Sequence, residues 1–238
     1  MSWLWRLLVV LFCLVFVAPA GLVLLYRFVP PPTTPLILGT WLAGDRAAQN
    51  WVPLDKISVA LVKAVVASED EKFCSHYGFD MEAIDKALDN NARGRRLRGA
   101  STISQQTAKN VFLPPNRTWT RKGIEAYFTV LIEALWPKSR IVEVYLNVIE
   151  LGQGNFGAEA ASQFYFHKPA ARLTAFEAAR LAAVLPDPKN YSVSKPGPYV
   201  ARRTGEIMAL AGGVTRDRLD SCVTHYGKLA AAPATKHL

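Results

Sequence analysis

The sequence predicts a mostly α-helical domain that follows one N-terminal transmembrane helix. About 19 uncharged and largely apolar residues run from Leu7 to Leu25, which at about 1.5 Å per residue is long enough to cross the hydrocarbon core of a bilayer. Beyond residue 54, apolar residues recur at helical spacing, and alternating stretches typical of strands are few. Side chains that commonly cap helices precede several of these apolar runs.

The apolar N-terminal segment has two interpretations. Val17-Ala-Pro-Ala20 resembles a small-residue site at which a signal peptide is cleaved. A retained anchor is favoured, because the apolar run continues from Gly21 to Leu25 and aromatic residues stand at both ends of the span, where they prefer the headgroup region. Arg6 and Arg27 flank the span and orient it only weakly. We therefore predict a membrane anchor over residues 1–29.

The rest of the chain is predicted to form one domain behind a short connection. The 238 residues are 50% hydrophobic, which is enough for one substantial core. Prolines from Pro30 to Pro35 stiffen the exit from the membrane. We predict a linker and domain entry over residues 30–54 and the folded domain over residues 55–238.

Apolar spacing and capping residues locate the helices of this domain. The first should run from near Asp55 to Glu69, and Thr174-Ala-Phe-Glu177 matches a capping box, which makes Glu177 structural. Further helices are expected at Met81–Leu88 behind Asp80, at Thr102–Phe112 behind Ser101, from Thr118 or Thr120 to Leu135, at Arg140–Ile149 behind Ser139, at Phe156–Tyr165, from Thr174 to before Pro186, at Tyr199–Leu210 and at Thr215–Tyr226.

The net charge of +9 indicates an anionic partner or a well-solvated basic loop. Four arginines stand within residues 93–98, and such a cluster attracts nucleic acid, anionic lipid or a phosphorylated substrate. Because the chain carries a membrane anchor, we predict no nucleic-acid partner. A loop over residues 89–97 that faces the lipid is expected instead.

The cysteines and histidines do not form a metal-binding pattern. The sequence has no C-x-x-C pair, and its four histidines are scattered. Cys13 lies within the apolar span. Cys74 and Cys222 remain, and they either pair in an oxidising compartment or stay as thiols.

The stretch Ala67-Ser-Glu-Asp-Glu-Lys-Phe73 places three acids directly behind an apolar run. It could be a metal site, a solvated helix end, or one carboxylate kept for chemistry. Adjacent helix positions diverge by about 100°, so three consecutive acids do not converge on one ion. Glu69 falls at a helix C-terminus, where a carboxylate is disfavoured. Asp70 and Glu71 are expected to complete the helix end or face water, His76 to hold the turn, and Asp80 to cap the next helix.

Two further segments carry polar residues at helical spacing. Ser101 is predicted to begin a helix, whose N-terminal amides suit an anion such as phosphate. Lys109 can share a face of that helix with Gln105 or Gln106, although an ordinary polar face is the simpler interpretation of the spacing. In Arg121-Lys-Gly-Ile-Glu125, the arginine and lysine precede the acid by four and three residues, which commonly marks surface ion pairs.

Five stretches in chain order form a specific set: Ala67-Ser-Glu-Asp-Glu-Lys-Phe73, His76-Tyr-Gly-Phe-Asp80, Arg98-Gly-Ala-Ser-Thr-Ile-Ser-Gln-Gln-Thr-Ala-Lys-Asn110, Arg121-Lys-Gly-Ile-Glu125 and Glu143-Val-Tyr-Leu-Asn147. They resemble the motifs of the family 51 peptidoglycan glycosyltransferases, and are most similar to the monofunctional biosynthetic transglycosylases. The resemblance extends from about Val59 to Pro188. Pro137 departs from it by standing where the family usually has serine, which is expected to shift only the start of the following helix.

The resemblance implies a fold, a substrate and a location. The fold is lysozyme-like and predominantly α-helical, with a smaller membrane-proximal lobe. The substrate is lipid II, and the product is an uncrosslinked glycan strand with release of undecaprenyl pyrophosphate. The implied location is the cytoplasmic (inner) membrane, with a single-pass anchor and the catalytic domain on the periplasmic side. Cell-wall synthesis and division proteins are the partners that this family suggests.

The resemblance also assigns roles to residues. Displacing pyrophosphate from an anomeric carbon requires a base for the incoming hydroxyl and positive charge for the leaving group. Glu69 corresponds to the general base. Glu125 corresponds to a second carboxylate near the pyrophosphate, where it could hold a divalent metal, magnesium or manganese. The phosphates are engaged by Lys109, Arg121 and Lys122, and the same cleft is lined by Ser101, Thr102, Gln106 and Asn110.

Two other functions are consistent with parts of the sequence. A lytic enzyme of the same fold would cleave glycan with paired carboxylates, but it has no need of the cations Lys109, Arg121 and Lys122. A non-catalytic scaffold would use its basic loop to bind anionic lipid. Ser192-Val-Ser-Lys195 fits the S-x-x-K pattern of a transpeptidase, but no K-T-G follows, so we predict no transpeptidase activity.

Overall fold

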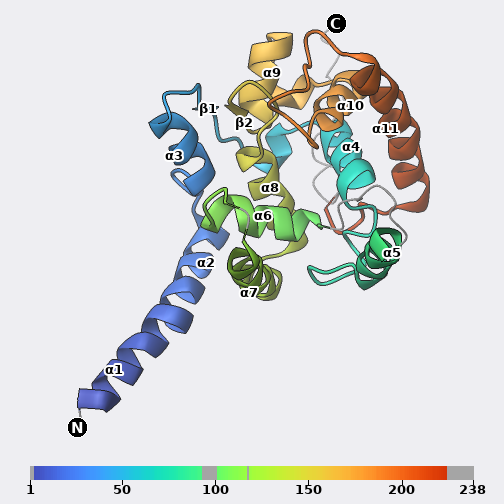
Figure 1. Ribbon diagram of the computed structural model, residues 1–238. Helices are drawn as coiled ribbons and strands as arrows, with labels where there is room; N and C mark the ends of the chain where they lie inside the picture. The colour runs from blue at the N-terminus through green and yellow to red at the C-terminus, as the bar shows by residue number, and fades with distance from the viewer. Residues whose placement is uncertain (1–2, 93–100, 117, 224–238) are drawn as a thin grey trace, which may run out of the picture.

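The computed structural model describes residues 3–92, 101–116 and 118–223, and it begins with the anchor. Helices α1 (Trp3–Phe12) and α2 (Ala18–Phe28) are joined by a π-helical turn at Cys13–Val17 into one rod that projects from the domain (Figure 1). Within the described residues, it is the one helix that is long and apolar enough to cross a membrane. The predicted apolar span therefore lies inside a single helix.

The domain is built from two groups of helices. Helices α4 (Val59–Glu69), α10 (Ala175–Ala183) and α11 (Pro198–Asp217) pack on one another, and their core includes the fully buried Leu61, Leu181 and Ile207. In the second group, α6 (Ile103–Phe112) packs against both α7 (Trp119–Leu135) and α8 (Lys138–Val148). Helix α8 contributes a nearly continuous buried face, which contains Ile141, Val142, Val144, Tyr145, Leu146 and Val148.

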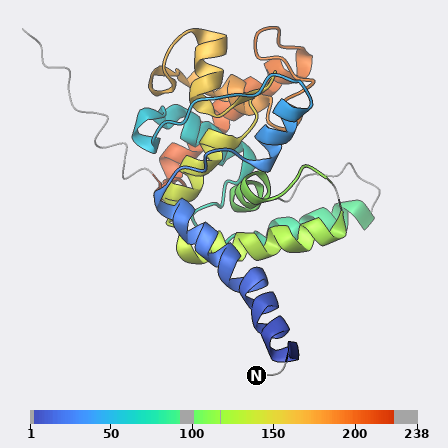
Figure 2. The ribbon, with the colours of Figure 1, turned by 90° about the vertical axis from the view of Figure 1, so that its left-hand side faces the viewer.

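The remaining helices lie around these two groups. Helix α5 (Met81–Ala92) follows the loop after α4, and α9 (Ala158–Phe166) lies at the end of the domain far from the anchor (Figure 1). Figure 2 shows α7 lying across the anchor close to the place where the anchor enters the domain, and the two helices are in contact. The predicted mostly α-helical class is confirmed.

Residues 30–54, predicted as a linker and domain entry, carry structure of their own. Thr34 caps helix α3 (Pro35–Leu42) by accepting a hydrogen bond from the Ile37 amide at 3.2 Å. Strand β1 (Ala48–Gln49) pairs in parallel with β2 (Asn155–Phe156). A Cβ at Gly154 would lie 1.8 Å from the Arg46 carbonyl oxygen, so only glycine allows this close approach. The segment is therefore attached to the domain by a pairing too short to produce an alternating pattern.

Several predicted helix starts are wrong by one turn or less. Helix α4 begins at Val59 rather than near Asp55, because residues 54–56 form a 3₁₀ turn and the Ser58 hydroxyl caps the helix. Helix α6 is capped by Thr102 rather than Ser101. Helix α8 begins directly after Pro137, whose fixed φ suits a helix entry, rather than after Ser139.

The predicted break near the end of the domain is also wrong. Helix α11 continues through Gly212 and Gly213 and includes Thr215, which was expected to open a separate helix reaching residue 226. Each glycine costs a helix only about 1 kcal/mol relative to alanine, and α11 is held by its packing against α4 and α10. Residues 224–226 of that prediction lie outside the described residues, as do the arginines of residues 93–98 and most of the loop predicted over residues 89–97.

Other predicted boundaries agree with the structure or differ from it by a few residues. Glu69 is the last residue of α4, and Thr118 caps α7. Asp80 accepts a hydrogen bond from the Ala83 amide at 3.0 Å at the start of α5, which continues to Ala92 instead of Leu88. Thr174 and Glu177 form the predicted capping box of α10. Helix α9 starts two residues later than expected because residues 155–156 form β2.

The anchor is joined to the domain by side chains that bond to backbone carbonyl groups. Arg27 of α2 donates to the Leu135 carbonyl at the end of α7 at 2.6 Å, and Arg140 of α8 donates to the Tyr26 carbonyl at the end of α2 at 2.7 Å. Trp136 donates to the Val23 carbonyl at 2.7 Å. The first two bonds satisfy carbonyl groups in the last turn of a helix, which have no partner within that helix. The anchor and α7 are thus held together.

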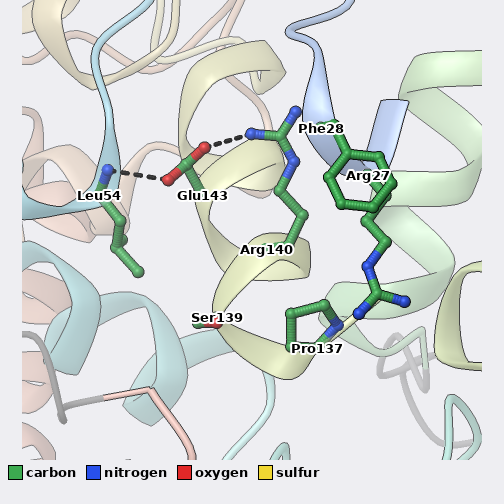
Figure 3. A pocket seen from close by; sticks show the side chains of 7 residues that line it. All are labelled: Arg27, Phe28, Leu54, Pro137, Ser139, Arg140 and Glu143. Carbon is green, nitrogen blue, oxygen red and sulfur yellow. Dashed lines mark hydrogen bonds and ion pairs between the residues drawn. The ribbon is translucent and has the colours of Figure 1, made fainter. Parts of the chain in front are cut away.

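A cavity of about 310 Å³ lies at this joint, as Figure 3 shows. Its charged side chains are already engaged, since Arg27 bonds to the Leu135 carbonyl, Arg140 pairs with Glu143, and Glu143 accepts from the Leu54 amide at 3.0 Å. The cavity is lined by Arg27, Phe28, Leu54, Pro137, Ser139, Arg140 and Glu143. We interpret it as part of the structural joint between anchor and domain.

Candidate active site

Glu69 ends α4 with its side chain directed at α6. The Gln106 amide donates to Glu69 Oε2 at 2.9 Å, and the carboxylate is partly buried. Burial raises the pKa of Glu69 above its ordinary value, and the nearby charge of Asp70 adds to this effect. The Gln106 hydrogen bond and the positive charges of Arg203 and Lys109 act in the opposite direction. The result is a carboxyl group that holds a proton more readily than an exposed glutamate does.

Asp70 connects the end of α4 to the start of α6. Its Oδ2 accepts from the Ile103 amide at 2.9 Å, and its Oδ1 pairs with His76 Nε2 at 2.8 Å. His76 Nδ1 accepts from the Gly78 amide at 3.1 Å, so this histidine holds the turn as predicted. Asp70 completes the helix end as predicted, but its carboxylate is buried rather than exposed to water. The neighbouring Glu71 is exposed.

Helix α6 presents part of the predicted polar set to Glu69. Gln106 and Lys109 act on Glu69 directly, the first by a hydrogen bond and the second by its charge. Gln105 does not share this role, because its side chain accepts from the Thr102 amide at 3.1 Å in a capping box.

The other predicted α6 residues have different surroundings. Thr102 donates its hydroxyl to the Gly78 carbonyl at 2.7 Å, so its side chain is used to hold the loop and the helix start. Asn110 is buried, whereas Ser101 is exposed ahead of the helix. The structure therefore brings Gln106 and Lys109 to the carboxylate and gives Thr102 a structural contact.

Glu125 lies in the second turn of α7, where it is held by two cations. Arg121 Nη1 donates to Glu125 Oε2 at 3.1 Å, and Lys122 Nζ pairs with Glu125 Oε1. The spacing suggested surface ion pairs, but the Glu125 side chain is only 3% exposed and Arg121 is 14% exposed. With two cations and one carboxylate, this cluster has a net positive charge. Guanidinium and ammonium groups are the usual protein partners of phosphate.

The donor set near Glu125 does not fit a metal ion held by the protein alone. Both carboxylate oxygens of Glu125 face cations. In the part of the chain that the structure describes, no three His, Cys, Asp or Glu side chains gather where they could hold a metal ion. Magnesium and manganese prefer several oxygen ligands.

Sequence reasoning missed two residues near Glu69. Tyr145 of α8 is fully buried and donates its hydroxyl to Gln106 Oε1 at 3.3 Å. Its only sequence signal is a phenol within an otherwise apolar buried run. Arg203 of α11 donates to the Ser68 carbonyl at 3.4 Å, next to Glu69. No local pattern marks Arg203, because α11 meets α4 only through the tertiary fold.

A disulfide fixes the loop that follows Glu69. Cys74 is bonded to Cys222, with their Cα atoms 5.6 Å apart. The bond decides between the two states that the sequence left open. It links the acidic loop to the segment that follows α11, the helix that packs against α4 and α10.

Comparisons with known proteins agree on one family. The Transglycosylase family model matches residues 37–211. A protein of Caulobacter vibrioides is 55% identical over 92% of this chain and 95% of its own length, and one of Rhodospirillum centenum is 54% identical over 86% and 92%. A Bdellovibrio bacteriovorus protein is 52% identical over 82% of this chain and 80% of its own. Each of the three is named a biosynthetic peptidoglycan transglycosylase.

Proposed function

Because the chain belongs to the transglycosylase family, it is a peptidoglycan glycosyltransferase, and we propose that it joins lipid II units into uncrosslinked glycan strands with release of undecaprenyl pyrophosphate. One observation carries this proposal. A partly buried carboxyl group with a raised pKa, Glu69, is acted on by the charge of Lys109 of α6, and α6 packs against α7, which carries the cations Arg121 and Lys122. Such an arrangement suits a reaction that needs both a base and an anion-stabilising group.

The proposed reaction assigns each group one task. Glu69 accepts the proton of the acceptor 4-hydroxyl as its oxygen forms a bond to the anomeric carbon of the donor. The bond from that carbon to the pyrophosphate oxygen breaks, and the electron pair leaves with the pyrophosphate. Lys109, Arg121 and Lys122 stabilise the leaving group's negative charge. Burial brings the pKa of Glu69 closer to neutral pH, where a general base is most effective.

The anchor gives single-pass attachment to a membrane, and we propose the inner membrane with the domain on the periplasmic side. The Cys74–Cys222 disulfide supports this side, because disulfides persist in oxidising compartments.

Crosslinking of the strands is assigned to other proteins. The Ser192 hydroxyl accepts from the Lys195 amide at 3.0 Å, which makes the S-x-x-K match a local turn. We therefore propose transpeptidases and other cell-wall synthesis or division proteins as partners of this enzyme.

An assay with two substrates separates the proposed reaction from its alternatives. The full-length protein in detergent is incubated with lipid II or with finished glycan. We expect polymer from lipid II and no shortening of the glycan. Shortened glycan without polymer would instead establish the lytic enzyme. If neither polymer nor shortened glycan forms, the non-catalytic scaffold is the remaining interpretation.

The same assay measures the contribution of a divalent metal. Since Arg121 and Lys122 already place positive charge beside Glu125, we expect polymerisation to persist at a reduced rate in chelator. Complete loss that magnesium or manganese restores would show that an ion is required.

A further inference from the structure

A chain of hydrogen bonds links α8 to Glu69 through α6. The Tyr145 hydroxyl donates to Gln106 Oε1 at 3.3 Å, and Gln106 Nε2 donates to Glu69 Oε2 at 2.9 Å. Resting on the proposed role of Glu69 as the base, we propose that Tyr145 is a positioning residue, whose hydroxyl keeps the amino end of the Gln106 amide directed at Glu69. The Tyr145 side chain is fully buried, so it acts through Gln106 and not on the substrate.

The direction of the Gln106 amide decides which form of Glu69 is favoured. An amide has a donor end and an acceptor end, whereas an ionised carboxylate can only accept. With its amino group toward Glu69, Gln106 stabilises the carboxylate. With its oxygen toward Glu69, it would repel the carboxylate and accept from the protonated acid. Since a base must be ionised before it can take a proton, the observed direction is the productive one.

Tyr145 is well suited to fix this direction. It lies on the buried face of α8, and its ring therefore has little freedom to move. Burial raises the pKa of the Tyr145 phenol well above its ordinary value, with the charges of Glu69 and Asp70 adding to this. The phenol thus stays protonated and able to donate at the pH values at which Glu69 titrates. The alternative partner of Gln106, the Ser101 carbonyl at 3.5 Å, is exposed and distant.

Tyr145→Phe retains the other groups that act on Glu69. Asp70 follows it at the end of α4, Lys109 faces it from α6 and Arg203 faces it from α11. Tyr145→Phe replaces one neutral ring with another of nearly the same volume. A change in the titration of Glu69 in this variant therefore reports the orientation of Gln106.

The test measures the titration of Glu69 in two ways. The first is the acidic limb of the pH profile for lipid II polymerisation. The second is the ¹³C resonance of the Glu69 carboxyl in labelled protein, assigned with Glu69→Gln. In Tyr145→Phe we expect both to move to higher pH by about half to one unit, the equivalent of one neutral hydrogen bond. The rate on the plateau above the limb should stay within about twofold.

Two further variants complete the design. Tyr165→Phe removes a hydroxyl that has no part in this chain, and it should leave the titration of Glu69 unchanged. Gln106→Met removes the donor itself and should shift the titration in the same direction as Tyr145→Phe, by at least as much.

The proposal is overturned if Gln106→Met shifts the titration and Tyr145→Phe does not, or if Tyr165→Phe shifts it equally. Thermal unfolding of each variant checks that the domain is folded. Should Tyr145→Phe fail to fold, 4-fluorophenylalanine at position 145 serves in its place, because its fluorine fills the space of the hydroxyl without donating a hydrogen bond. Unchanged titration in that variant would also overturn the proposal. Failure of the wild type to polymerise lipid II would reject the proposed function alone, since the carboxyl resonance is read without substrate.

Discussion

The two glutamates predicted to act in the site have opposite surroundings. Glu69 stands at the C-terminal end of α4, where its carboxylate accepts a hydrogen bond from a neutral amide and burial raises its pKa. Glu125 stands within α7 between two cations, Arg121 and Lys122. The first environment favours taking up a proton, and the second favours holding positive charge in place. Residue type alone therefore does not define the role of a carboxylate in this site.

The largest expected effect comes from removing the ionisable group of Glu69. Glu69→Gln keeps the shape and the acceptor for Gln106, but it cannot take a proton. We expect the rate of lipid II polymerisation to fall by about 10²–10⁴-fold, the usual contribution of a general base.

The stability of the same variant gives a second readout. The folded-state pKa of Glu69 is raised, so its ionisation costs stability as pH rises above the unfolded-state pKa. At neutral pH, Glu69→Gln should therefore unfold at the same temperature as the wild type or a higher one. A clear drop in the unfolding temperature would contradict this account.

The same substitution at Glu125 should have the opposite effect on stability. Glu125→Gln leaves Arg121 and Lys122 close together without a counter-charge in a site where the carboxylate was nearly fully buried. Breaking a buried pair costs about 3–5 kcal/mol, and the partial exposure of Lys122 places our expectation near about 3 kcal/mol. Denaturant unfolding of the two variants side by side measures the contrast. Equal stability of both would remove the distinction drawn between the sites.

A substitution of Asp70 tests whether the hydrogen bond that fixes the start of α6 is needed for the activity that depends on Glu69. Asp70→Asn weakens a charge-assisted bond to the Ile103 amide and the contact with His76, so we expect a loss of about 1–3 kcal/mol in stability. Polymerisation should fall as well, because Gln106 and Lys109 are carried by α6. Glu71→Gln is the matched control in the same loop, since Glu71 is exposed and should tolerate the change. Similar losses in both variants would argue against the proposed link.

Local features of the sequence were sufficient to predict many of the helix boundaries. Glu69 ends its helix as predicted, and Thr118 and Thr174 cap theirs, because caps and apolar spacing act within one or two helical turns. Thr102 rather than Ser101 caps α6, since the two adjacent hydroxyls match the same pattern and only packing selects between them.

The rest of the site depends on contacts between distant segments. The spacing of Arg121 and Glu125 is the same on a surface as in a buried cluster, so it did not reveal the burial of Glu125. Asp70 meets Ile103 through a long-range bond to which helix periodicity contributes nothing. The pairing of β1 with β2 likewise depends on the close approach of Arg46 to Gly154, which leaves no periodic pattern.

The smallest expected effect comes from removing the charge of Arg203. This charge lowers the pKa of Glu69 and so opposes the effect of burial. Arg203→Gln retains a donor for the Ser68 carbonyl but removes the charge that lowers the pKa of Glu69. The acidic limb of the polymerisation profile should therefore move to higher pH, by about a few tenths of a unit because the side chain is partly exposed. Arg202→Gln is the matched control, since its side chain is 68% exposed and pairs with Glu206. If both variants move the limb equally, the effect belongs to the overall charge of α11, and Glu69 is tuned by burial and Gln106 without a specific contribution from Arg203.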